Sequence, residues 1–233
     1  MILYRGFCLN ILIGLCGAKG SGKTTAFNAI KKVNNEISEI TLANKLKNVC
    51  SEVFEIPRNH FDSHKYKEKE LNNKIALDRD SVIRIFNAYE LHVPDEIVDS
   101  HIGKILTTPR HIAQYVGTEV LRSIYNHIHC DVAIKNVKSD IAIVTDLRFP
   151  DEIVFFKAHA PNFIPIYIKN VYAESLAGND QHESERHLYK LAQECPYVLV
   201  NDCPSKELFE KKSAFFILDL INKNKNAAGK IHV

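Results

Sequence analysis

The apolar residues of this chain follow two patterns, and the two patterns alternate along its length. Short, nearly continuous apolar runs are typical of buried strands, and they occur at 10–16, 39–43, 141–145, 163–168 and 196–200. Apolar residues three and four positions apart are typical of amphipathic helices, and this spacing occurs at 44–54, 80–91 and 109–125. Strands that alternate with helices predict an α/β fold in which helices flank a mostly parallel sheet.

Proline and capping residues refine these boundaries. Thr108 suits a helix cap and Pro109 suits the first turn that follows it. Pro150 opens a further helix after the strand at 141–145, whereas Pro165 weakens the strand at 163–168 or places it at a sheet edge. A closing helix is expected at 205–221.

Residues 17–24 read Gly-Ala-Lys-Gly-Ser-Gly-Lys-Thr and fit the phosphate-binding pattern of Gly, four residues, Gly, Lys, and Ser or Thr. The loop lies between a strand and a helix, so backbone N–H groups and the helix dipole can both face phosphate. Lys23 adds a charge near the β- and γ-phosphates, and the Thr24 hydroxyl is a magnesium ligand. A chance glycine turn is the alternative. The flanking strand and helix favour a nucleoside triphosphate site and a P-loop NTPase-type fold.

Composition narrows the function classes. The 233 residues are enough for one α/β domain with a large core, and the net charge of +2 is too small to indicate nucleic-acid or membrane binding. The six cysteines form no CxxC pair and no metal-ligand spacing, so we expect a reducing cytosol and no disulfide framework. The apolar N-terminus runs directly into the phosphate loop, and no segment is long enough to span a membrane. We therefore expect a soluble cytoplasmic protein, in the host cytoplasm if it is viral.

The predicted helix at 109–125 carries a polar face opposite its apolar one. Arg110, Gln114 and Thr118 are four positions apart, and Gly117 lies beside them. Arginine offers a fork for phosphate, and glutamine offers an amide that can pair with a base edge. A ligand could approach the backbone closely at Gly117. The alternative is an ordinary solvated polar face.

Asp146 and Arg148 directly follow the strand at 141–145, and ligands of open α/β sheets collect beyond the carboxyl ends of strands. Asp146 could orient magnesium-bound water, accept the proton of an acceptor, or hold Arg148. Arg148 could bridge donor and acceptor phosphates. A salt-bridge cluster that opens the next helix is the alternative.

A third polar cluster spans 180–187. It is not an HExxH zinc motif, because its second histidine comes one residue too late. Either it forms a mobile lid that contributes Arg186, or it begins a helix capped by Ser184.

Taken in order, these motifs resemble those of the deoxynucleoside monophosphate kinases of large tailed bacteriophages, over residues 12–208. The motifs that carry the resemblance are 17–24, Leu42–Lys47, Thr108–Arg110 with Gln114 and Gly117–Glu119, Thr145–Arg148 with Glu152, Asp180–Glu185 and Val200–Asp202. The resemblance implies transfer of the ATP γ-phosphoryl group to a deoxynucleoside 5′-monophosphate, with Mg²⁺ as the metal.

The same resemblance implies site residues. ATP and Mg²⁺ would be held by Gly17, Gly20, Ser21, Gly22, Lys23, Thr24 and Thr25, with Thr24 as the metal ligand. The monophosphate pocket would be lined by Lys19, Leu46, Lys47, Arg110, Gln114, Gly117, Thr118 and Arg148, and supported by Asp146 and Glu152. The catalytic residues would be Lys23, Arg110, Asp146 and Arg148.

The chain departs from the family at Cys130, where members can carry a tryptophan, so base selectivity does not carry over. We expect one P-loop kinase domain over 1–222, with 58–106 as a helical insertion or acceptor-side region. The charged segment 58–73 would be a mobile surface, 172–191 a lid and 223–233 a flexible tail.

Two other functions remain open from the sequence. The acceptor could be dephospho-coenzyme A or another small metabolite, or the protein could be a nucleotide-dependent switch with only slow hydrolysis. If the protein is a deoxynucleoside monophosphate kinase, we expect its partner to be the monophosphate substrate and expect no binding to nucleic acid or membrane. The sequence is also compatible with a homodimer.

Overall fold

The computed structural model describes residues 9–63, 65–160, 162–171 and 187–228, and the contacts within the chain divide it into two compact units. The first unit combines Met1–Leu42 with Cys130–Val233, and the second is Ala43–His129. The segment 58–106, expected as an insertion within one domain, lies inside the second unit, which extends beyond it on both sides. Its role toward an acceptor stays a prediction, as does the lid at 172–191, most of which lies outside the described residues.

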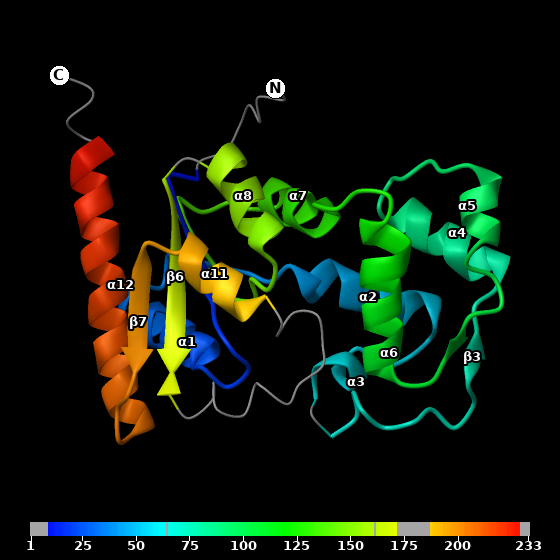
Figure 1. Ribbon diagram of the computed structural model, residues 1–233, viewed down its shortest axis with the longest axis horizontal. Coiled ribbons are helices and arrows are strands. Elements are labelled where there is room, and N and C mark those ends of the chain that lie inside the picture. Colours follow the sequence, from blue (N-terminus) through cyan, green and yellow to red (C-terminus); the bar gives the residue numbers. More distant parts are fainter. Residues whose placement is uncertain (1–8, 64, 161, 172–186, 229–233) are drawn as a thin grey trace. The chain divides into compact units, whose positions relative to one another are not determined.

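The described part of the first unit contains a five-stranded sheet with the order β2-β5-β1-β6-β7. Its strands β6 and β7 are labelled in Figure 1, where β7 lies beside the long helix α12. Every neighbouring pair in this sheet is parallel, which confirms the predicted α/β fold class. The strands are β1 (Ile11–Cys16), β2 (Ser38–Ile40), β5 (Ile141–Val144), β6 (Phe163–Asn170) and β7 (Tyr197–Asn201). All five carboxyl ends therefore lie at one edge of the sheet.

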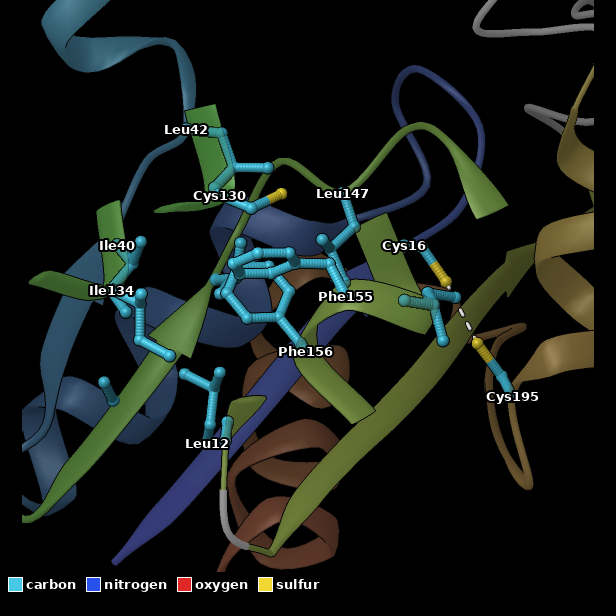
Figure 2. Packing of buried hydrophobic residues seen from close by; sticks show 14 of the residues in the cluster. Leu12, Cys16, Ile40, Leu42, Cys130, Ile134, Leu147, Phe155, Phe156 and Cys195 are labelled. Carbon is cyan, nitrogen blue, oxygen red and sulfur yellow. Dashed lines mark hydrogen bonds between the residues drawn. The ribbon is translucent and has the colours of Figure 1, made fainter. Parts of the chain in front are cut away.

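Alternation along β1 sends side chains into two cores, one on each face of the sheet. Ile11, Ile13 and Leu15 pack in the core that holds α1 (Lys23–Val33) and α12 (Lys206–Ala228). Leu12 and Cys16 pack in the opposite core, which is shown in Figure 2. The helices that contribute to this second core are α7 (Ile128–Lys135), α8 (Pro150–His159) and α11 (Leu188–Glu194).

Pro165 does not lie in an edge strand, so that expectation is wrong. β6 pairs with β1 on one side and with β7 on the other. Pro165 pairs with Gly14 of β1, but the pairing with β7 begins only at Ile166. The missing proline N–H therefore falls just outside the ladder with β7, where it breaks no hydrogen bond to that strand.

Other boundaries also differ from the expected ones. β2 ends at Ile40, because Ala43 already begins the next helix, and α12 continues past residue 221 to Ala228. Residues 229–233 of the expected tail lie outside the described residues.

The second unit is built from short helices and one small antiparallel pair of strands. Thr108 caps its central helix as expected, since the side-chain oxygen accepts a hydrogen bond from His111 N at 3.0 Å. That helix continues from α6 into a π-helix, η1, a form that recurs at functional sites. The elements are α2 (Ala43–Val53), α3 (Asn59–Asp62), β3 (Ile75–Ala76), α4 (Arg79–Ala88), α5 (Asp95–Asp99), β4 (Ile105–Leu106), α6 (Pro109–Gln114) and η1 (Tyr115–Arg122).

Parts of the charged segment 58–73 form backbone hydrogen bonds with the rest of this unit, and the mobility expected for the segment stays a prediction. Leu71 N donates to Thr107 O, and Arg110 N donates to Lys67 O, each at 2.9 Å. Within the described residues, no helix combines the length and the apolar character that crossing a membrane requires.

We predict that Phe156→Ala lowers the free energy of unfolding by about 3–5 kcal/mol, because the ring is wholly buried between α8 and the sheet. Val154→Ala on the same helix is the control. Its side chain is 56% exposed, so the cost should be within about 0.5 kcal/mol. Urea denaturation measures both, and equal effects would contradict the packing described above.

Candidate functional site

The carboxyl edge of the first unit's sheet carries the phosphate loop and Asp146, which the sequence singled out for binding, together with two asparagines. The loop at 17–24 follows β1, and Asp146 lies just beyond β5. Asn170 and Asn201 are the last residues of β6 and β7. In an open parallel sheet this edge is where a ligand binds.

The phosphate loop has a backbone shape that only glycine adopts without strain at two critical positions. Gly17 has φ +137° and Gly22 has φ +111°. A Cβ on Gly17 would lie 2.3 Å from Ile168 O, and one on Gly22 would lie 2.6 Å from a ring carbon of Phe209. The loop therefore turns tightly against β6 and α12, and its close approach leaves no room for a side chain.

Hydrogen bonds from three side chains hold this loop. Lys23 Nζ donates to Gly17 O at 2.6 Å and to Ala18 O at 2.8 Å, so the lysine spans the loop from the first turn of α1. Asn201 Nδ2 donates to Ser21 O at 3.0 Å, and Asn170 Nδ2 donates to Gly20 O at 3.4 Å. Sequence reasoning assigned no role to either asparagine, although each ends a strand at the ligand-binding edge.

The remaining loop residues differ in exposure. Ser21 is wholly buried, whereas the side chains of Lys19 and Thr24 are exposed. Thr24 lies in the first turn of α1, next to Lys23, where a magnesium ion bound with nucleotide would meet a hydroxyl. Thr25 follows and is half-buried.

Asp146, Arg148 and Glu152 form a second cluster at the same sheet edge. Asp146 Oδ1 accepts a hydrogen bond from Leu42 N at 2.9 Å, which joins the end of β5 to the chain beyond β2. Glu152 is 5% exposed, and its Oε2 accepts from Arg148 N at 2.8 Å and Phe149 N at 3.1 Å. Both carboxylates thus position backbone, while the Arg148 side chain is exposed. Their expected roles toward a ligand stay predictions.

The expected acceptor residues other than Lys19 and Arg148 belong to the second unit. Lys47 Nζ donates to Asp62 Oδ1 at 3.0 Å, and Arg58 also pairs with Asp62. Arg110 forms an ion pair with Glu68, whose side chain is 56% exposed. The cations expected to hold phosphate are therefore balanced by carboxylates from the segment 58–73. Gln114 and Thr118 are half-buried on the same helix as Arg110.

Gly117 packs against another helix of its own unit, a contact that the sequence did not indicate. A Cβ on Gly117 would lie 2.7 Å from Leu46 Cδ2, so the glycine admits the buried Leu46 of α2 rather than open space. The carbonyl of Gly117 accepts a hydrogen bond from His129 Nε2 at 3.3 Å. Cys130, the position at which family members can carry a tryptophan, is buried in the core of the first unit. The ring that lies near Gly117 belongs to the preceding residue, His129.

His129 and Tyr89 bring two unexpected polar atoms into this part of the second unit. Their rings meet edge to face with centroids 6.1 Å apart, and Lys45 Nζ lies 4.8 Å from the centroid of Tyr89. Tyr89 Oη and His129 Nδ1 are buried without a hydrogen-bond partner among the described residues. Such atoms mark a place for water or a ligand. No spacing in the sequence could reveal them, because three separate helices supply the residues.

Burial lowers the pKa of His129 to about 4, and nearby Arg122 adds to this effect, while the bond to Gly117 opposes it. The imidazole is therefore neutral at physiological pH. Because Nε2–H donates to a carbonyl, Nδ1 is left as a hydrogen-bond acceptor.

Comparison with known proteins adds a family likeness to this geometry. No family model matches the sequence. Over 217 residues the chain is 28% identical to a protein of Acanthamoeba polyphaga mimivirus named "Putative deoxynucleotide monophosphate kinase". The alignment covers 86% of this chain and 93% of that protein. The resemblance predicted from the motifs is confirmed.

Two solved structures are also similar to the chain, each at 13% identity. One is a shikimate kinase from Bacteroides thetaiotaomicron, with a TM-score of 0.39, and the other is a dephospho-CoA kinase from Campylobacter jejuni, with a TM-score of 0.42. Each alignment covers 91% of this chain and 98% of the other.

We predict that Gly22→Ala weakens ATP binding by about tenfold or more, since a side chain at this φ strains the loop and meets Phe209. Gly103→Ala is the matched control. Gly103 also has a positive φ, +82°, but no atom lies within 4 Å of the added Cβ. Calorimetric titration should therefore show unchanged ATP affinity for Gly103→Ala, and a similar loss in both variants would contradict the prediction.

We also predict that His129 makes folding sensitive to mild acid. Between about pH 6.5 and pH 4 the unfolded chain binds a proton at this residue and the folded chain does not. The stabilisation is complete above about pH 6.5 and decreases as the pH falls toward 4. From pH 7 to pH 5, wild type should lose about 2 kcal/mol more unfolding free energy than His129→Gln.

Urea denaturation at the two pH values measures this difference. The same substitution at His92, whose side chain is exposed, is the control for the loss of a histidine elsewhere in the second unit. Equal losses in wild type and His129→Gln would show that burial does not disfavour the charged imidazole.

Proposed function

We propose that this protein is an ATP-dependent phosphotransferase whose acceptor is a deoxynucleoside 5′-monophosphate. The observation that carries the proposal is the loop at 17–24, in which glycines pass too close to β6 and α12 for any side chain and Lys23 spans the loop carbonyls. The similarity to the mimivirus protein supports the choice of acceptor.

On the donor side, the loop fits a triphosphate. Its backbone and the start of α1 would surround the β- and γ-phosphates, with Lys23 moving from the loop carbonyls to the phosphate oxygens. Gly17, Gly20, Ser21, Gly22 and Thr25 complete this cradle, and Thr24 would hold Mg²⁺. The metal supplies positive charge that offsets the charge spreading over the transferred group.

On the acceptor side, we assign the phosphate to Arg110, with Lys19, Lys47 and Arg148 as further cations. An incoming phosphate must displace Glu68 from Arg110, as one anion replaces another. Gln114 and Thr118 would contact the nucleoside, and the packing of Leu46 against Gly117 would support that side of the pocket. Glu152 would hold the backbone at Arg148, and Asp146 would hold the backbone at Leu42. Little covalent assistance is needed, because in-line transfer depends on positioning two phosphates and neutralising their charge.

An acceptor panel tests this function. ATP is incubated with each common deoxynucleoside and ribonucleoside monophosphate, and with dephospho-coenzyme A, while diphosphate formation and free phosphate are followed. We expect ADP and a deoxynucleoside diphosphate in equal amounts. Phosphorylation of dephospho-coenzyme A alone would assign a different kinase, and acceptor-independent phosphate release would indicate a switch. Lys23→Ala should lower turnover by on the order of a thousandfold, which separates the activity from a contaminating kinase.

Arg110→Ala should raise the KM for the acceptor by about 10- to 100-fold and leave ATP affinity unchanged, because only the acceptor phosphate loses a charged hydrogen bond. Glu68→Gln should lower the same KM by about two- to fivefold, since it removes an exposed competing carboxylate. Arg79→Ala removes an ion-paired arginine of the same unit and is the control. Lost ATP affinity in Arg110→Ala would contradict this assignment.

Three further expectations about this protein stay predictions. These are a cytoplasmic location, the absence of nucleic-acid and membrane partners, and an allowed homodimer.

A further inference from the structure

Two buried thiols meet at the base of the phosphate loop. Cys16 Sγ and Cys195 Sγ lie 3.2 Å apart, although the residues are 179 positions apart in the chain (Figure 2). Cys16 is the last residue of β1 and is wholly buried, and Cys195 follows α11 and is 7% exposed. Both are free thiols. A disulfide needs sulfurs about 2.05 Å apart, so the pair must close by only about 1.2 Å.

The position of Cys16 connects this pair to nucleotide binding. The residue after it is Gly17, the first of the phosphate loop, whose carbonyl accepts the hydrogen bond from Lys23. Gly17 lies close to β6, because a Cβ added to it would be 2.3 Å from Ile168 O. The thiol of Cys16 also donates to Ile166 O at 3.5 Å, and it loses this bond when its hydrogen is removed.

We propose that Cys16 and Cys195 are a reversible dithiol–disulfide site, and that its closure weakens ATP binding at the adjoining loop. The oxidant is a small-molecule disulfide of the glutathione class. Only the effect on ATP rests on the proposed function, and it needs the donor site alone.

The chemistry takes two exchange steps. The Cys195 thiolate attacks one sulfur of oxidised glutathione, which forms a mixed disulfide and releases one glutathione thiolate. The Cys16 thiolate then attacks Cys195 Sγ, which closes the Cys16–Cys195 bond and releases the second glutathione. Two protein thiols are oxidised, one glutathione disulfide is reduced to two thiols, and the two protons pass to water or to the released thiolates.

The order of these steps follows from exposure. Cys195 is the more exposed of the two thiols, so it meets the small disulfide first. The hydrogen bond with Cys195, together with burial, raises the pKa of the Cys16 thiol above its usual value, so the second step is the slower one.

The test uses the full chain treated with oxidised glutathione. Intact mass should fall by two hydrogen atoms, and peptide mapping should find Cys16 joined to Cys195. Calorimetric titration should then show ATP binding about tenfold weaker, because the loop is displaced from its binding geometry. Dithiothreitol should restore both the mass and the affinity. A different cysteine pair, a persistent glutathione adduct on Cys195 or an unchanged ATP affinity would each overturn the proposal.

Two serine variants complete the design. Cys195→Ser removes one member of the pair, so oxidation should no longer alter ATP affinity. Cys203→Ser keeps the pair and should behave as wild type. Retained sensitivity in Cys195→Ser would overturn the assignment, and if that variant does not fold, the peptide map of wild type decides. ATP titration needs no acceptor, so failure here is distinguishable from failure of the acceptor panel.

Discussion

The shape of the phosphate loop at 17–24 depends on how closely its backbone approaches the neighbouring strand and helix. Gly17 lies against the carbonyl of Ile168, and Gly22 lies against the ring of Phe209. Because the first contact is with backbone, it cannot relax as a side chain would. β1 lies between β5 and β6 in the sheet, and this order places the end of β1 beside the end of β6. The loop geometry is therefore a consequence of sheet topology.

Asparagines and carboxylates at the same edge extend this constraint. Asn170 and Asn201 reach the loop from the ends of two further strands. Asp146 holds the backbone of Leu42, and Glu152 holds two amides at the start of α8. Each of these side chains holds backbone in place through a hydrogen bond near the end of a strand or the start of a helix. Under the proposed function, this preorganised backbone would favour phosphoryl transfer, because the donor phosphates would meet groups that are already in place.

The second unit holds several cations close to the carboxylates of the segment 58–73. Asp62 pairs with Lys47 and Arg58, and Glu68 pairs with Arg110. These ion pairs are partly exposed and so contribute little to stability. Under the proposed function, an acceptor phosphate would replace the carboxylate of Glu68 at Arg110. The same unit buries Tyr89 Oη and His129 Nδ1, which have no hydrogen-bond partner among the described residues. Burying such atoms lowers the stability of the fold unless water or a ligand forms hydrogen bonds with them.

The amino-acid sequence alone determined the parallel α/β pattern, the strand–loop–helix at 10–33 and the cap at Thr108. Each of these rests on neighbours in the chain, where spacing and residue type are sufficient. Only the tertiary structure decided the rest. It placed β6 inside the sheet despite Pro165, set Leu46 against Gly117, and paired Arg110 with Glu68. It also brought Cys16 to Cys195 across most of the chain. These contacts join residues far apart in the sequence, and no local periodicity records which distant side chains will meet.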